Sequence, residues 1–134
     1  MSWAALIFWI ITAGGGFVLL AIWLKNDGMQ QRDGGRIRPA LILTHFLLAA
    51  TGLVLWIVYV ATDSSAIAWI AFALLLVVAL IGFTMFGIWA RQRSRKEREP
   101  AEQKFPVAVV GLHGVLAATT LVLVLLAAAG VGGS

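Results

Sequence analysis

Residues 45–55 read HFLLAATGLVL and residues 113–123 read HGVLAATTLVL, so that eight of eleven aligned positions are identical. Both segments lie inside long apolar runs, and each begins with one of the chain's two histidines. A second matched pair precedes them along the chain, GFVLLAIW at 16–23 and GFTMFGIW at 82–89, and each of these segments ends in tryptophan. Leu- and Ala-rich helices often match by chance, but His, Gly and Trp landmarks in the same order seldom do. The pattern predicts two tandem copies of one helical hairpin.

The composition around these segments is that of a membrane protein. Of the 134 residues, 61% are hydrophobic and only 12% are charged, and the mean hydropathy is +0.96. Soluble domains contain about 45–50% apolar and about 25% charged residues. The chain also contains no cysteine. These values exclude a water-soluble enzyme, a disordered tail and a disulfide-linked scaffold, and the length suits one domain, residues 1–134.

The apolar residues gather in four runs without internal charges, each long enough to cross a membrane core, which takes about 20 helical residues. The runs are residues 3–24, 39–62, 65–90 and 106–130. Backbone groups inside a membrane must be paired, and the runs lack the alternation of a barrel strand, so each is expected to be helical. We therefore predict an all-α, integral membrane, up-down four-helix bundle built from two repeat units, about 1–64 and 65–134.

The positions of the basic residues predict how the chain is oriented in the membrane. All ten Lys and Arg residues lie between the first and second runs or between the third and fourth. The positive-inside rule places both basic segments in the cytoplasm and both termini outside, as expected for a multi-pass protein of the cell (inner) membrane. The basic residues thus serve to orient the chain and to contact membrane lipid, and no nucleic acid partner is expected.

The two histidines are the candidate functional residues. Intramembrane ionisable residues are rare and commonly functional. From a rise of about 1.5 Å per residue, His45 and His113 lie about 9–11 Å from the cytoplasmic ends of their helices, and Gly16 and Gly82 lie about 12 Å in. The second and fourth helices are diagonal in an up-down bundle, so the two imidazoles are expected to face each other.

Small residues continue the histidine-bearing faces, namely Ala49 and Gly52 beyond His45, and Ala117 and Thr120 beyond His113. Two imidazoles on opposed helices with small neighbours suit a haem, whose macrocycle is about 10 Å across. Zinc or copper would need three or four protein ligands, and no Asp, Glu or Cys lies at this depth. Without a CxxCH motif, one haem b with two axial histidines is expected, and Arg38 and Arg91 are candidates for binding its propionates.

With these residues, the chain resembles the haem-binding four-helix bundle in cytochrome b of bc complexes. In that family, histidines on the second and fourth helices bind haem, and glycines on the first and third helices make room for the ring. The resemblance implies that His45 and His113 are the iron ligands and that Gly16 and Gly82 contact the macrocycle. A second histidine pair, usual in that family, is missing, so the resemblance implies one haem and electron transfer on the cytoplasmic side.

Other interpretations remain open. Membrane histidines can serve packing, and glycines can serve close helix contact, so a cofactor-free accessory or scaffold subunit of a larger membrane complex is the alternative. A transporter or channel is less favoured, because intramembrane carboxylates are absent. A quinone or a redox partner subunit is a possible partner of an electron carrier, and the chain is expected to be a carrier or a subunit rather than a stand-alone enzyme. Tyr59 and Asp63 are candidates for a quinone or proton site, and neither is assigned a role.

Overall fold

The computed structural model describes residues 1–30, 37–96 and 100–133. It is 86% helical, and the described part of the chain contains no strand. The long helices are α1 (Ser2–Lys25), α2 (Pro39–Thr62), α3 (Ser65–Ser94) and α4 (Val107–Ala128), and two short 3₁₀ helices are η1 (Gly28–Gln30) and η2 (Ala101–Lys104). The expected all-helical class is therefore confirmed.

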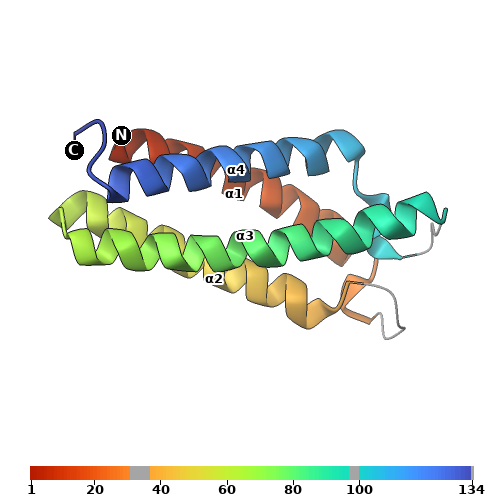
Figure 1. The fold of residues 1–134 in the computed structure, drawn as a ribbon. Helices are drawn as coiled ribbons and strands as arrows, with labels where there is room; N and C mark the ends of the chain where they lie inside the picture. The colour runs from red at the N-terminus through yellow and green to blue at the C-terminus, as the bar shows by residue number, and fades with distance from the viewer. Residues whose placement is uncertain (31–36, 97–99, 134) are drawn as a thin grey trace.

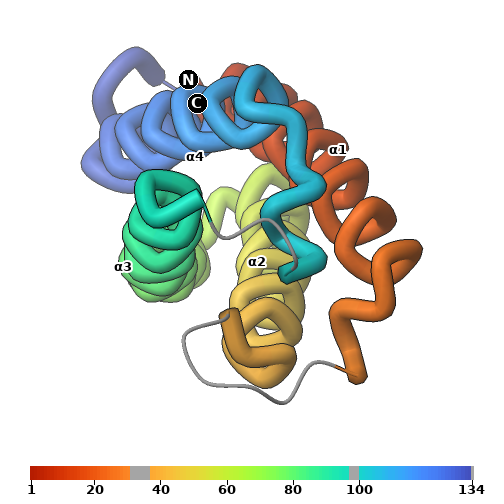
Figure 2. Tube along the Cα trace, turned by 90° about the vertical axis from the view of Figure 1, so that its right-hand side faces the viewer, coloured from red at the N-terminus to blue at the C-terminus, as the bar shows by residue number. Residues whose placement is uncertain are grey.

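The four helices form an up-down bundle in which chain neighbours are also neighbours in space (Figure 1). The most extensive contacts join α2 to α3 and α1 to α4, while α3 packs less against α4 and α1 less against α2. The end-on view in Figure 2 accordingly places α2 across the bundle from α4, and α1 across from α3. Both termini and the α2–α3 turn lie at one end, here called the termini end, and the other connections lie at the loop end.

The helix boundaries follow local sequence signals. They differ from the expected ones by one residue at both ends of α1 and at the start of α4, and by more at the ends of α3 and α4. Pro39 begins α2, where a proline loses no hydrogen bond, and Asp63 ends α2 in the left-handed conformation (φ 53°). Helix α3 continues to Ser94 rather than stopping near 90, because the polar residues that follow the apolar run are good helix formers. Helix α4 ends at Ala128 and not at 130, since Gly130 has a positive φ of 78°.

All four helices are long and apolar enough to cross a membrane. Large apolar side chains remain exposed on their outer faces, including Phe17, Leu47, Leu80 and Leu112, each more than half exposed. A water-soluble monomer rarely exposes so much contiguous apolar surface. The outer surface therefore suits hydrocarbon rather than water.

Buried side chains occur in two separate regions. A core at the termini end is built around Trp9, Trp56, Leu75 and Val124, and a smaller buried group at the loop end includes Trp23, Trp89 and Glu102.

Between these two regions, no described residue is buried in 13–22 of α1, 39–51 of α2, 79–88 of α3 or 107–119 of α4. We call these four stretches the loosely packed layer. The ten residues of α1 in this layer correspond to about 15 Å along the bundle.

Candidate functional site

Both histidines lie in the loosely packed layer, and each is fixed by a backbone carbonyl of a neighbouring helix. Nδ1 of His45 lies 3.0 Å from the carbonyl oxygen of Val78 on α3, and Nδ1 of His113 lies 3.0 Å from that of Thr12 on α1. A carbonyl oxygen can only accept, so each Nδ1 carries the proton and donates it. The lone pair of each neutral ring is therefore on Nε2. Metal-binding histidines commonly have this arrangement, in which a backbone acceptor sets the tautomer.

The glycines on α1 and α3 allow the rings to approach. A Cβ atom built on Gly16 would lie 3.2 Å from Cε1 of His113, and one built on Gly82 would lie 3.2 Å from Cε1 of His45. Each glycine follows the carbonyl-bearing residue by four positions, so it lies one helical turn further along the same face. Gly15 adds to the contact, because its Cβ would lie 3.5 Å from Nδ1 of His113. A side chain at Gly16 or Gly82 would push the facing imidazole away from its carbonyl partner.

The two rings face each other across the bundle axis. Their centroids are 6.4 Å apart, and their planes are inclined by 69°. Two imidazoles bound to opposite faces of one metal would have centroids about 6.2 Å apart, from metal–nitrogen bonds of about 2.0 Å and about 1.1 Å from each nitrogen to its ring centre. The observed centroid separation of His45 and His113, 6.4 Å, is close to this value.

The protein donor set favours a macrocycle over a bare ion. In residues 1–30, 37–96 and 100–133, no group of three or more His, Cys, Asp or Glu side chains could hold a metal. Two imidazoles would occupy two of the six positions of iron, and a porphyrin supplies the other four. The loosely packed layer is deeper along the axis than a ring of about 10 Å.

The other small residues differ in their surroundings. Gly52 does not border open space, because Trp9 Cζ2 would lie 3.0 Å from a Cβ at this position. Thr120 is 1% exposed, and its hydroxyl lies 2.9 Å from that of Thr12. Both positions belong to the termini-end core, since a tryptophan and a threonine from α1 fill the space that the sequence suggested was free. Ala49 and Ala117 lie nearer the histidines and are partly buried.

The two candidate propionate ligands lie at the loop end. Arg38 is the residue just before α2, and Arg91 is in the last turns of α3. Both are exposed. Their positions on the helix ends nearest the histidines suit the binding of anionic groups, and their side chains contact neither imidazole.

A polar network at the loop end is not evident from the sequence pattern. The carboxylate of Glu102 is fully buried and accepts hydrogen bonds from the Ile37 N–H (2.9 Å) and the Gln92 amide (3.1 Å). The backbone carbonyl of Glu102 accepts one from Trp89 Nε1 (3.0 Å). This network ties the segment before α2 to the end of α3, and it closes the loop end of the loosely packed layer.

Thr12 and Val78 are the site residues that sequence reasoning missed. They contribute through their backbone carbonyls, which any residue possesses, so side-chain identity cannot reveal them. Their spacing of four residues before Gly16 and Gly82 is the only available signal.

In comparisons with known proteins, no family model, curated protein or solved structure matches the chain.

Proposed function

We propose that the protein is a membrane b-type cytochrome that binds one haem between α2 and α4, with His45 and His113 as its two axial ligands. The observation that carries the proposal is the ring pair. Its centroid separation of 6.4 Å suits one iron, and both Nδ1 atoms are held by carbonyls. Two imidazoles that keep their protons on Nδ1 and leave Nε2 unprotonated, at one level of the bundle, support a shared ligand more than a packing role.

The proposal includes insertion in a cell membrane with both basic connections in the cytoplasm. All ten Lys and Arg residues occur in the sequence segments 25–38 and 91–104, which join α1 to α2 and α3 to α4. This asymmetry is the usual determinant of orientation. The haem level then lies in the cytoplasmic half of the membrane.

We also infer that the bundle arose from two tandem hairpins. The α4 histidine is bonded to Thr12 of α1, and the α2 histidine is bonded to Val78 of α3. Thr12 and Val78 occupy corresponding places before the matched segments 16–23 and 82–89. Each histidine thus depends on the other hairpin, so neither hairpin alone would provide a complete site.

When bound, the haem supplies one-electron redox chemistry, and the protein supplies its ligands and surroundings. The carbonyls of Thr12 and Val78 hold the proton of each ring on Nδ1 and so leave each Nε2 unprotonated. If His45 and His113 both bound the iron, they would supply its two protein ligands, which would favour electron transfer over catalysis at the metal. The apolar helices exclude water from the site, and Arg38 and Arg91 are placed to neutralise propionates at the loop end.

Absorption spectra of the purified protein test this proposal. We expect reduced-minus-oxidised difference spectra of a low-spin b-type haem, and a pyridine haemochrome ratio of about one haem per chain. His45→Ala and His113→Ala should each remove the low-spin spectrum, because each deletes one ligand. A colourless wild-type preparation from cells supplied with haem would refute the proposal and leave the accessory-subunit interpretation.

A control substitution separates ligand loss from general damage. Thr84 lies on the exposed face of α3, and its hydroxyl is bonded within its own helix to the Leu80 carbonyl (2.9 Å). Thr84→Ala should leave the haem content and the spectrum unchanged. A spectrum that survives both histidine substitutions would contradict the ligand assignment even if haem is bound.

A further inference from the structure

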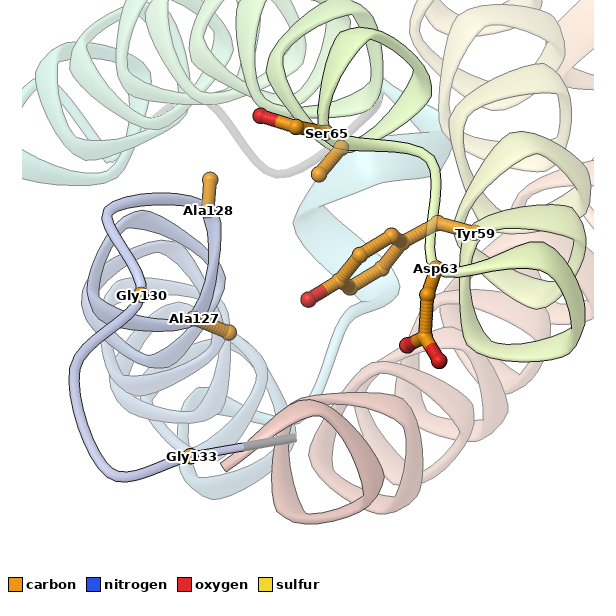
Figure 3. Close-up of a pocket in the computed structure, with 8 residues that line it drawn as sticks. Tyr59, Asp63, Ser65, Ala127, Ala128, Gly130 and Gly133 are labelled. Atoms are coloured by element: carbon orange, nitrogen blue, oxygen red, sulfur yellow. The ribbon is translucent and has the colours of Figure 1, made fainter.

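A pocket of about 390 Å³ opens at the termini end, far from the histidines. Figure 3 shows that it lies between the end of α2, the start of α3 and the end of α4. Its wall includes the Tyr59 ring, Asp63 and Ser65 on one side, and Ala127, Ala128 and Gly133 on the other. Pockets of about 300–1,000 Å³ hold small ligands.

The pocket contains one polar group held by packing, on Tyr59, and one exposed carboxylate, on Asp63. The Tyr59 ring packs on Trp56 with centroids 4.7 Å apart, and Tyr59 is only 9% exposed. Its hydroxyl points into the pocket (Figure 3). Asp63 ends α2 with a left-handed backbone (φ 53°), and its carboxylate lies below the Tyr59 ring in the same view. Within the described residues, neither side chain has a hydrogen-bond or ion-pair partner.

The negative charge of Asp63 has no oppositely charged side chain near it among the described residues of the termini end. Asp63 is the only charged side chain in residues 39–90 and 105–134, because every Lys and Arg occurs in the sequence segments 25–38 and 91–104. The pocket rim also presents backbone acceptors beyond the end of α4, such as the Gly133 carbonyl. This carbonyl accepts a hydrogen bond from the amino group of Met1 at 3.3 Å, so it already has a donor.

We propose that this pocket binds a primary ammonium group, with Asp63 as its counter-ion and the Tyr59 hydroxyl as a second acceptor. A primary ammonium carries three N–H donors, and the Asp63 carboxylate and the Tyr59 hydroxyl can each accept one of them. A quaternary ammonium carries no such donor and would satisfy only the charge. An anion would meet an unpaired carboxylate and is disfavoured.

The level of the pocket along the membrane-crossing helices suggests two sources for the ammonium group. Tyr59 and Asp63 lie in the last turn of a membrane-crossing length of helix, at the level expected for lipid headgroups. The ammonium of phosphatidylethanolamine would reach this level from the membrane, and a free amine would reach it from water. Both present the same chemistry to Asp63.

Native mass spectrometry of protein released from nanodiscs of mixed phosphatidylethanolamine and phosphatidylcholine tests the proposal. These lipids differ in the N–H donors of their headgroups. We expect wild type to retain phosphatidylethanolamine with about a tenfold preference, the effect of one charge-assisted hydrogen bond. Asp63→Asn should abolish the preference, and Tyr59→Phe should reduce it. In discs of phosphatidylcholine alone, ethanolamine hydrochloride titrated against thermal unfolding tests the free amine.

Asp27→Asn is the matched control, because Asp27 also has a left-handed backbone (φ 59°) but lies at the loop end. Asparagine tolerates this conformation, so both variants should fold. Lipid selectivity lost only in Asp63→Asn supports the pocket with a lipid source. An ethanolamine-dependent rise in unfolding temperature, lost only in Asp63→Asn, supports it with a free amine. No preference and no response in wild type, or equal behaviour of Asp63→Asn and wild type, would overturn the proposal. Neither readout requires haem, so the outcome is independent of the proposed function.

Discussion

Replacing Gly16 with alanine tests the fit between α1 and the His113 ring. The added methyl would lie 3.2 Å from Cε1 of His113, closer than the usual carbon–carbon contact of about 3.5–4.0 Å. The ring has little freedom to retreat, because its Nδ1–H donates to the Thr12 carbonyl at 3.0 Å. Metal–ligand distances tolerate only about 0.2 Å of change. Overpacking of this kind costs about 1–2 kcal/mol, so we expect haem binding to weaken about 5- to 30-fold.

Gly14→Ala is the matched control on the same helix. A Cβ at Gly14 has nothing within 4 Å, and alanine is favoured over glycine in a helix by about 1 kcal/mol. This variant should therefore keep wild-type haem affinity and equal or better thermal stability. On α3, Gly82→Ala and Gly87→Ala form the corresponding pair, since Gly87 also has no neighbour within 4 Å.

The assay is titration of haem-free protein with haemin, followed by the absorbance of the low-spin complex. Circular dichroism in detergent verifies that the helices remain formed. Gly16→Leu and Gly82→Leu extend the series, and both should lose most bound haem while the protein remains inserted. Equal haemin affinity of Gly16→Ala and Gly14→Ala would refute the reasoning, because the contact with His113 would then have no consequence.

Three further substitutions test the packing around the site. Glu102→Ala removes the acceptor of a buried backbone N–H and should destabilise the fold by about 1–3 kcal/mol, measured as a lower unfolding temperature. Gly28→Ala places a methyl against the Trp23 indole and should lower the free energy of unfolding by about 1–3 kcal/mol. Its control is Gly111→Ala, which has no neighbour within 4 Å and should leave the stability of the fold unchanged. Equal unfolding temperatures of the two variants would contradict this prediction. Thr120→Val removes a buried hydroxyl pair and should cost about 1 kcal/mol without changing haem stoichiometry.

Much of the fold follows from the sequence because membrane helices depend on local composition. The uncharged runs predict all four helices, and the short turn at Asp63 makes α2 and α3 adjacent. An up-down order then places the two histidine-bearing helices across the bundle from each other. Because His45 and His113 lie at equal depth, their rings are predicted to lie close together. The separation of 6.4 Å between the ring centroids confirms this prediction.

The details that escape sequence reasoning depend on contacts between distant segments. Trp9 fills the space beside Gly52, and nothing in the sequence around either residue indicates that α1 and α2 meet there. The carbonyl of Thr12 fixes His113 across 101 residues of chain. The burial of Glu102 is equally hidden, because an acidic residue in a charged connection suggests exposure, whereas the fold buries it and bonds its carbonyl to Trp89 Nε1.

The most direct test of the central claim is the electron paramagnetic resonance spectrum of the oxidised, purified protein. The imidazole planes are inclined by 69°, and nearly perpendicular axial ligands keep two iron d orbitals close in energy. We therefore predict a single low-spin ferric signal of the strongly anisotropic type, absent in both His45→Ala and His113→Ala. A high-spin signal alone in the wild-type protein, or a low-spin signal that persists in either variant, would contradict ligation by this histidine pair.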